Sequence, residues 1–531
     1  MKVLIDNGCD IECIEKKSKQ TWLSVACYHG YDKIVAYLVE HRANVNTKNH
    51  VRNTPLKLAA TNCHFNIVKM LVEHKADINI RNDEGSASIS GACYHDNGEI
   101  VTYLIKHGAN VDTQDNNGNT PLILAASKGY FNMVKMLIEN EADVDIKNEE
   151  GFTCVSVASY HGYCKILTYL IEHGGIVNTQ NKRGNTALMI AASKGRFKIV
   201  QILIKNGAEI DIRNKTGSTS VKLASYKHKG KILTYLIEHG GSVNTQNKRG
   251  NTPLMIAASE GRLDIVQILI EYGADINIRN KEGFTCLSFA SYHGYCKILT
   301  YLIEHGGSVN TQNKRGNTAL MIAASIGRFE IVQILIKNGA EIDIRNETGS
   351  TSVKLASYKY KGKILTYLIE HGGSVNTQNK RGNTPLMIAT SEGRVYIVQK
   401  LIEHGADINI RNKEGSTCLS FASEKGLDNT VMCFLDKGAC INSANNNGDL
   451  PLMLALQDSH ISTAKLLITF GANVNMKNKE GLPPLHFARQ NKLYNIEDIR
   501  GKTLQKEFHR NARNLIFITL VIFIAWLYFT T

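Results

Sequence analysis

Apolar residues along this chain fall into short clusters, and two clusters followed by one polar segment form a recurring unit. In the unit 252–284 the first cluster, at 253–258, is almost wholly apolar, and the second, at 265–270, has apolar residues three or four apart. This spacing predicts two short helices. Gly261 and Gly273 are expected to end them, because glycine suits the left-handed backbone found at helix C-termini.

Polar residues at the borders of the unit support the same prediction. Thr252 can cap the first helix with its hydroxyl, and Pro253 follows at the first helical position, where a missing N–H costs nothing. The polar segment 275–283 contains Asn280 and Gly283, which are typical turn residues. Each unit is therefore expected to consist of two antiparallel helices and a projecting, hairpin-like loop.

The unit repeats every 33 residues with no insertion or deletion. The position of Thr21 recurs at Thr54, Ala87, Thr120, Thr153, Thr186, Thr219, Thr252, Thr285, Thr318, Thr351, Thr384, Thr417, Leu450 and Pro483. A fixed period of this length predicts an all-α solenoid, in which each unit packs only on its neighbours.

The period also divides the chain. We expect fourteen full units over 21–482, a partial unit at 1–20, a degenerate unit with a polar spacer at 483–514, and a separate apolar segment at 515–531. Met1 enters at a second helix, so either the natural N-terminus lies upstream or the half-unit is a frayed cap.

Two helices and a loop in 33 residues resemble the ankyrin repeat. The resemblance rests on Thr-Pro-Leu at 54–56, 120–122, 252–254 and 384–386, on Gly-Ala after many second helices, and on Asn-x-x-Gly at the loop tips. The full Pro-Leu-His form occurs once, at 484–486, and elsewhere the histidine position holds Met, Lys, Ser or Ile. The resemblance implies an interaction protein without catalytic activity.

Two kinds of unit alternate within the array, and this alternation gives a 66-residue period. Above it lies a duplication, because residues 153–284 and 285–416 differ at 13 positions. Every second loop tip carries a Lys-Arg pair, whereas intervening tips are mixed or acidic, as at 149–150. These basic tips are Lys182-Arg183, Lys248-Arg249, Lys314-Arg315 and Lys380-Arg381.

Tyrosines also recur every 66 residues, once in every second unit. They are predicted at the ends of first helices, at Tyr160, Tyr226, Tyr292 and Tyr358. The ankyrin resemblance implies that loop tips and helix ends form a concave partner-binding surface, with the tyrosines as anchors and the basic tips as an electrostatic rim. The structural alternative is that the tips are simply solvated and that each tyrosine covers the neighbouring unit.

Composition and motifs limit the kinds of partner and the kinds of chemistry that are expected for this chain. The formal charge of +14 suits acidic partners, anionic lipid or nucleic acid, but the 48 acidic residues are interspersed and favour a mixed-sign surface. Acidic residues between the basic tips disfavour nucleic-acid binding. The twelve cysteines follow the repeat without a C-x-x-C pair, which predicts reduced thiols and no zinc. Phosphate-loop, metalloprotease and serine-hydrolase motifs are absent, so no catalytic residue, cofactor, metal or small-molecule substrate is expected.

The C-terminal segment differs from the array. Residues 515–529 contain no charge and follow a basic stretch at 509–513. Fifteen residues are short for a membrane span, but flanking arginines can snorkel and aromatic residues gather at the far end. We expect a membrane anchor that leaves the array in the cytosol. Its representative residues are Leu515, Phe517, Leu520, Phe523, Trp526, Tyr528 and Phe529.

These observations predict a scaffold that is tethered to a membrane and binds a protein partner. Two other interpretations stay open: an elastic tether between membrane and cytoskeleton, because near-identical units behave as a one-dimensional array, and the ankyrin domain of a truncated channel or receptor.

Overall fold

A computed structural model describes the chain apart from residues 1–9, 15–18, 227–228, 359–360, 492 and 494–531. The chain divides into two compact units, Met1–Asp275 (unit one) and Ile276–Thr531 (unit two), which we describe separately. The predicted membrane anchor at 515–531 lies outside the described residues. Within the part that is described, none of the helices has the length and apolar character needed to cross a bilayer.

Short helices make up both units. In unit one they are α2 (Trp22–His29), α3 (Asp32–Glu40), α4 (Pro55–Thr61), α5 (Phe65–Glu73), α6 (Ser88–Tyr94), α7 (Gly98–Lys106), α8 (Pro121–Lys128), α9 (Phe131–Glu139), α10 (Cys154–His161), α11 (Cys164–Glu172), α12 (Ala187–Lys194), α13 (Phe197–Lys205), α14 (Ser220–Ala224), α15 (Gly230–Glu238), α16 (Pro253–Ser259) and α17 (Leu263–Glu271). In unit two they are α18 (Cys286–His293), α19 (Cys296–Glu304), α20 (Ala319–Ile326), α21 (Phe329–Lys337), α22 (Ser352–Ala356), α23 (Gly362–Glu370), α24 (Pro385–Ser391), α25 (Val395–Glu403), α26 (Cys418–Glu424), α27 (Asp428–Asp436), α28 (Pro451–Gln457), α29 (Ile461–Thr469) and α30 (Pro484–Gln490).

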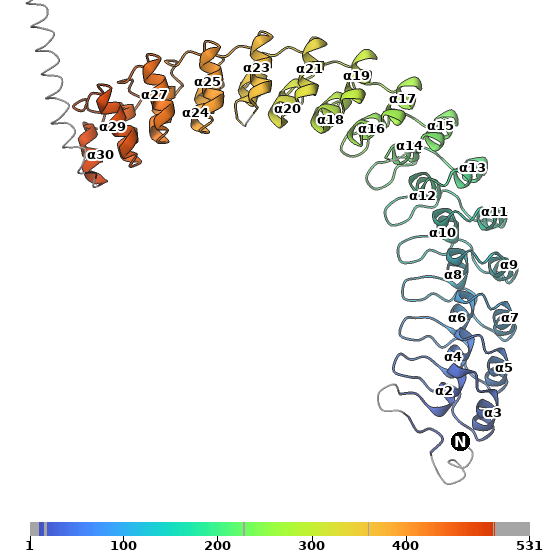
Figure 1. The fold of residues 1–531 in the computed structure, drawn as a ribbon. Helices are drawn as coiled ribbons and strands as arrows, with labels where there is room; N and C mark the ends of the chain where they lie inside the picture. Colours follow the sequence, from blue (N-terminus) through green and yellow to red (C-terminus); the bar gives the residue numbers. More distant parts are fainter. Residues whose placement is uncertain (1–9, 15–18, 227–228, 359–360, 492, 494–531) are drawn as a thin grey trace, which may run out of the picture. The chain divides into compact units, whose positions relative to one another are not determined.

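Each repeat contributes a first helix with an even label and, except after α30, a described second helix with an odd label. In unit one the first helices form a layer between the loops and the second helices (Figure 1). Contacts run between neighbouring repeats: α8 packs on α6, α10 and its own second helix α9. In unit two, α20 packs likewise on α18, α22 and α21. The predicted solenoid of paired helices is confirmed.

The helix ends follow the sequence signals. The Thr186 hydroxyl accepts a hydrogen bond from the Met189 N–H at the start of α12, and Gly195 ends that helix at a φ of 78°. The core lies between the two helix layers, where Leu122 of α8 and Leu137 of α9 are fully buried. Each such leucine stabilises the fold by about 1.5–3 kcal/mol, and it does so mainly across repeats.

Helices α14 and α22 are shorter than predicted, so Tyr226 and Tyr358 lie two residues beyond helix ends rather than within them. In α10 the helix continues to His161 and stops at Gly162, whose φ is 91°. The sequence has His228 and Tyr360 at the positions equivalent to Gly162. The missing glycine does not by itself account for the early helix ends, because α4 and α6 also lack it and run to seven residues, with Cys63 and Asp96 at positive φ.

The loops were predicted to resemble hairpins, but the described residues contain no strand. Their only β pairing is an isolated bridge between Ile14 and Thr21. The tips are instead turns closed by an asparagine or, at 115, an aspartate: the Asn181 side-chain oxygen accepts from the backbone N–H groups of Arg183 and Asn185, at 3.0 and 2.9 Å. This asparagine turn replaces the strand pairing of a hairpin.

Neighbouring tips are joined by backbone hydrogen bonds. In unit one the Lys182 N–H donates to the Glu150 carbonyl at 2.9 Å, and the Lys215 N–H donates to the Arg183 carbonyl at 3.0 Å. The tips are so close that a Cβ added at Gly184 would lie 2.7 Å from the Lys215 nitrogen. We call this series of bonds the tip ladder; it joins the main chains of neighbouring tips and does not involve the lysine and arginine side chains.

The tip ladder predicts a difference between two glycine substitutions in adjacent repeats. Gly184 and Gly207 both have a positive φ, of 75° and 81°, but Gly207 faces open space. Gly207→Ala should cost about 1 kcal/mol for backbone strain alone. Gly184→Ala should cost about 2–4 kcal/mol, because it also pushes the neighbouring tip away. Urea unfolding followed by circular dichroism measures both, and equal losses would contradict the close tip contact.

Candidate functional site

The exposed side chains of the loop tips and of the first-helix ends lie on the same side of each unit. We call this surface, defined by the basic tips and the helix-end tyrosines, the tip face. All eight lysines and arginines of the four basic tips are exposed. Lys182 forms an ion pair with Glu149 at 3.5 Å, but the two side chains are 62% and 66% exposed. Such a pair contributes little to stability, so these charges remain available to a partner.

Tyr160 and Tyr292 occupy equivalent positions, but their surroundings differ. The Lys194 ammonium donates to the Tyr160 hydroxyl at 3.1 Å and lies 4.3 Å from the centre of its ring. The duplicated repeat has Ile326 in place of Lys194, and Tyr292 is 56% exposed against 41% for Tyr160. Tyr160 therefore partly covers its neighbour, as the structural alternative expected, whereas Tyr292 presents a bare aromatic surface.

Tyr226 and Tyr358 each lie close to an arginine of a basic tip. Burial and then the Glu260 carboxylate raise the pKa of Tyr226, while the Arg249 guanidinium lowers it. Tyr358 has the same surroundings in unit two. The charges of the tip arginines Arg249 and Arg381 therefore act on these two tyrosines.

The tip face of unit one contains a hollow of about 860 Å³. Tyr28 and Tyr94 line it from the helix ends, and Asp83 and Glu84 line it from a tip, with Lys57 between them. The two tyrosines share the 66-residue register of Tyr160, a signal in the sequence that the prediction did not use. The charge of the tip face therefore changes along unit one, from acidic at this hollow to basic at Lys182.

Unit two has a comparable hollow of about 590 Å³. Glu414 and Asp449 line it from two adjacent tips, and Glu424 and Asp458 line it from the first-helix side. Neither hollow includes any of the predicted binding residues. The alternation of basic tips pointed to the duplicated repeats 153–416, whereas the hollow of unit one lies before them and the hollow of unit two begins at their C-terminal end, near Glu414.

The prediction also missed three buried lysines on first helices. Lys222 and Lys354 are each 1% exposed, and Lys57 is 7% exposed. They occupy the position that follows Thr-x-x at the start of a repeat, where other repeats have Met or Ser, such as Met255 and Ser288. Burial lowers the pKa of each lysine to about 8. The repeat register identifies the three lysines in the sequence, but it does not show that their side chains are buried.

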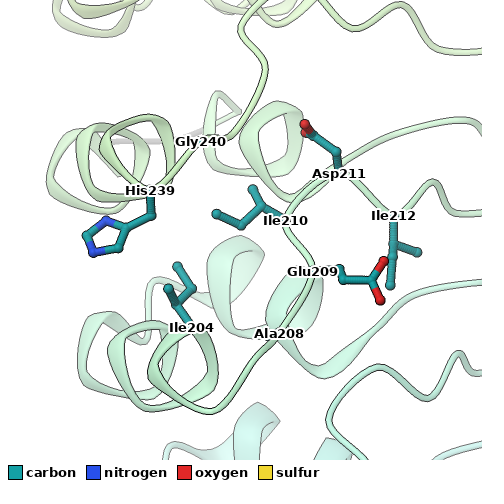
Figure 2. Close-up of a pocket in the computed structure, with 8 residues that line it drawn as sticks. All are labelled: Ile204, Ala208, Glu209, Ile210, Asp211, Ile212, His239 and Gly240. Atoms are coloured by element: carbon teal, nitrogen blue, oxygen red, sulfur yellow. The ribbon is translucent and has the colours of Figure 1, made fainter.

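On the second-helix side of unit one lies another hollow, of about 640 Å³, where Ile204 and His239 flank the loop residue Asp211 (Figure 2). The Asp211 carboxylate and the His239 imidazole of this hollow each form hydrogen bonds with the backbone. Both Asp211 carboxylate oxygens accept from the Ser242 N–H, at 3.3 and 3.2 Å, and the His239 Nδ1 lies 2.8 Å from the Tyr235 carbonyl oxygen. The Asp211–Ser242 bonds join adjacent repeats, whereas the His239–Tyr235 contact lies within one repeat, at the end of α15.

The described part of the chain holds no group of His, Cys, Asp and Glu residues arranged to bind a metal ion. Buried thiols such as Cys93 and Cys154 have a raised pKa because burial disfavours the thiolate. They behave as small apolar residues of the core.

A family model described as ankyrin repeats (three copies) matches the chain. The matched segments are 1–82, 81–148, 140–214, 207–280, 275–346, 320–412, 354–445 and 419–499. The chain belongs to the ankyrin repeat family. The matched segments are all ankyrin repeats, and no catalytic domain is detected. Ankyrin repeats imply protein partners, whose identity is unknown. No curated protein matches the chain.

The buried lysines give the ankyrin array a defined pH dependence. Lys222 has a pKa of about 8 in the folded chain and a usual value of 10.5, so below pH 8 folding buries a charge. Between pH 8 and 10.5 the unfolded chain binds more protons, and the stability of the natural protein rises with pH.

Lys222→Met introduces the residue found at Met255, which is 2% exposed. The variant should be more stable than the natural protein at pH 7, by about 1–3 kcal/mol, and the advantage should shrink toward pH 10.5. Urea unfolding of both proteins at the two pH values measures the difference. An advantage that does not change with pH would contradict a charged, buried Lys222.

Proposed function

We propose that this ankyrin array is a scaffold without catalytic activity that binds an extended segment of a partner protein along its tip face. The observation that carries the proposal is the hollow of about 860 Å³ between the tips and the helix ends, lined by exposed tyrosines and by charges. Exposed aromatic anchors with a charged rim are typical of protein interfaces.

The tip ladder supports this proposal energetically. A partner that binds a surface with a fixed main chain loses less conformational freedom on binding than one that must order mobile loops. Every repeat offers one tip and every second repeat one helix-end tyrosine, so affinity would accumulate over several repeats. The change from acidic to basic tips in unit one would set the direction of the bound segment.

Replacing Tyr292, Lys314 and Arg315 together by alanine should remove one exposed tyrosine and one basic tip from the tip face of unit two. We expect binding of a tip-face partner to weaken by about tenfold or more, because an exposed aromatic anchor and two charges are lost. Proximity labelling with the full chain measures which proteins are recovered.

Lys337→Ala is the matched control, because Lys337 is exposed at the C-terminal end of the second helix α21. It should leave the recovered proteins unchanged. If the triple variant also leaves them unchanged, the partner binds elsewhere. Recovery of cytoskeletal filaments alone would favour the elastic tether.

We also propose that residues 515–529 anchor the array to a membrane, with the repeats in the cytosol. The uncharged sequence of this segment and its basic flank support the proposal. Membrane attachment would restrict the scaffold to partners at the same surface.

A chain that ends at Asn514 tests the anchor. The full chain should sediment with membranes and resist extraction by high salt, whereas the shortened chain should remain in the supernatant, because about fifteen apolar residues supply the attachment. Identical fractionation of the two chains would refute the anchor, and the tip-face proposal would be unaffected.

A further inference from the structure

Five Asn-Gly pairs lie in the described part of the chain, at 97–98, 117–118, 206–207, 338–339 and 447–448. An asparagine that precedes glycine can lose its side-chain amide without an enzyme. The glycine has no side chain to shield its backbone nitrogen, which can attack the asparagine Cγ. The asparagine side chain must turn toward that nitrogen, so the contacts of each side chain distinguish the five pairs.

Three of the five side chains are held by hydrogen bonds. The Asn97 oxygen accepts from the Ile100 N–H at 3.0 Å, at the start of α7. The amides of Asn206 and Asn338 each donate to a carbonyl of the helix that they end, at 2.8 Å. Each of these side chains must break a hydrogen bond before its Cγ can be attacked.

Asn117 and Asn447 differ from these three, because they lie at loop tips. Both are exposed, and neither side chain forms a hydrogen bond with another described residue. The preceding residues Asn116 and Asn446 donate their amides to carbonyls of the previous tip, at 2.6 and 2.7 Å. The unbonded amide at each of these two tips is therefore the one next to glycine.

The backbone at the glycine does not separate the two groups of pairs. The Gly118 N–H donates to the Asp115 carbonyl at 2.8 Å, and the Gly207 N–H donates to the Ile204 carbonyl at 3.1 Å. Both glycines have a positive φ. The freedom of the asparagine side chain is therefore the difference between them.

The fold keeps glycine next to the two exposed asparagines. Gly118 and Gly448 have φ values of 75° and 82°. A Cβ at Gly118 would lie 2.6 Å from the Glu149 nitrogen, and a Cβ at Gly448 would lie 2.8 Å from the Lys479 nitrogen. The close contact between tips thus retains the residue that makes the asparagine reactive.

We propose that Asn117 and Asn447 are sites of spontaneous deamidation. At the first site the Gly118 nitrogen bonds to the Asn117 Cγ, the Cγ–Nδ2 bond breaks, and the amide leaves as ammonia with the proton of the Gly118 N–H. Water then opens the cyclic imide at either of its two carbonyls and returns a proton to the Gly118 nitrogen. The products are aspartate and isoaspartate, and water is the only other reactant.

Each conversion adds a negative charge to a hollow of the tip face. Asn117 lines the hollow of unit one together with Glu84, and Asn447 lines the hollow of unit two together with Glu414. Glu84 and Glu414 occupy the equivalent position one repeat earlier, so the repeat accepts a carboxylate there. Aspartate at 117 and 447 would make two successive tips acidic at each hollow. This inference goes beyond the proposed function and does not depend on a partner.

Peptide mass spectrometry of the full chain tests the two sites after incubation in oxygen-18 water at mildly alkaline pH. Asn117 and Asn447 should deamidate about tenfold faster, or more, than Asn206 and Asn338, whose amides are hydrogen-bonded. The products should carry one oxygen-18 atom from water and should separate into aspartate and isoaspartate forms. Equal rates at the four asparagines would overturn the proposal, and formation of aspartate alone would overturn the attack by glycine.

Asn117→Gln with Asn447→Gln keeps both exposed amides but enlarges the ring that the attack must close, which slows the reaction. The variant should fold, because the longer Glu84 and Glu414 side chains occupy equivalent positions. On isoelectric focusing the natural chain should produce more acidic forms with time, whereas this variant should not.

The matched control is Asn206→Gln with Asn338→Gln, which should produce acidic forms at the natural rate. Acidic forms that appear as fast in the 117 and 447 variant as in the control would overturn the proposal. The tip-face proposal is tested by partner recovery and is unaffected by either result.

Discussion

An ankyrin repeat in this chain cannot bury its own apolar face, so every repeat depends on the next one for its core. Leu122 and Leu137 are fully buried because adjacent repeats cover them. The same register that aligns the helices also brings the loop tips within hydrogen-bonding distance, as between Lys215 and Arg183. An insertion of one residue would break both sets of contacts, which gives a physical reason for the unbroken 33-residue period.

The helices and loops were predictable because their signals are local. The hydroxyl of Thr186 and the positive φ of Gly195 act at the ends of one helix, and the sequence shows both residues. The exposure of the basic tips was also predictable, because a Lys-Arg pair in a turn has little to pack against. The short helices α14 and α22 were not predicted, and the missing glycine does not explain them, because α4 and α6 also lack it and run to seven residues.

The candidate site was predicted less well, because burial and charge there depend on neighbouring repeats. A lysine at position 222 looks like any polar residue in the sequence, but the tip and helices around it leave it 1% exposed. Tyr160 and Tyr292 have similar local sequences, but Lys194 contacts the Tyr160 ring, and Ile326 stands in its place beside the more exposed Tyr292. The duplication therefore provides natural comparisons within one chain. The domain boundaries and the membrane anchor stay predictions.

The central claim is that the tip ladder holds the tip face in one conformation for a partner. Amide hydrogen exchange on the natural full chain tests it most directly, at the N–H groups of Lys182, Lys215 and Lys248, each bonded to the preceding tip. These amides should exchange at least about a hundredfold more slowly than in an unfolded peptide, because exchange requires opening of the tip contact. Exchange at the unfolded rate would show that the tips move independently and would contradict the account.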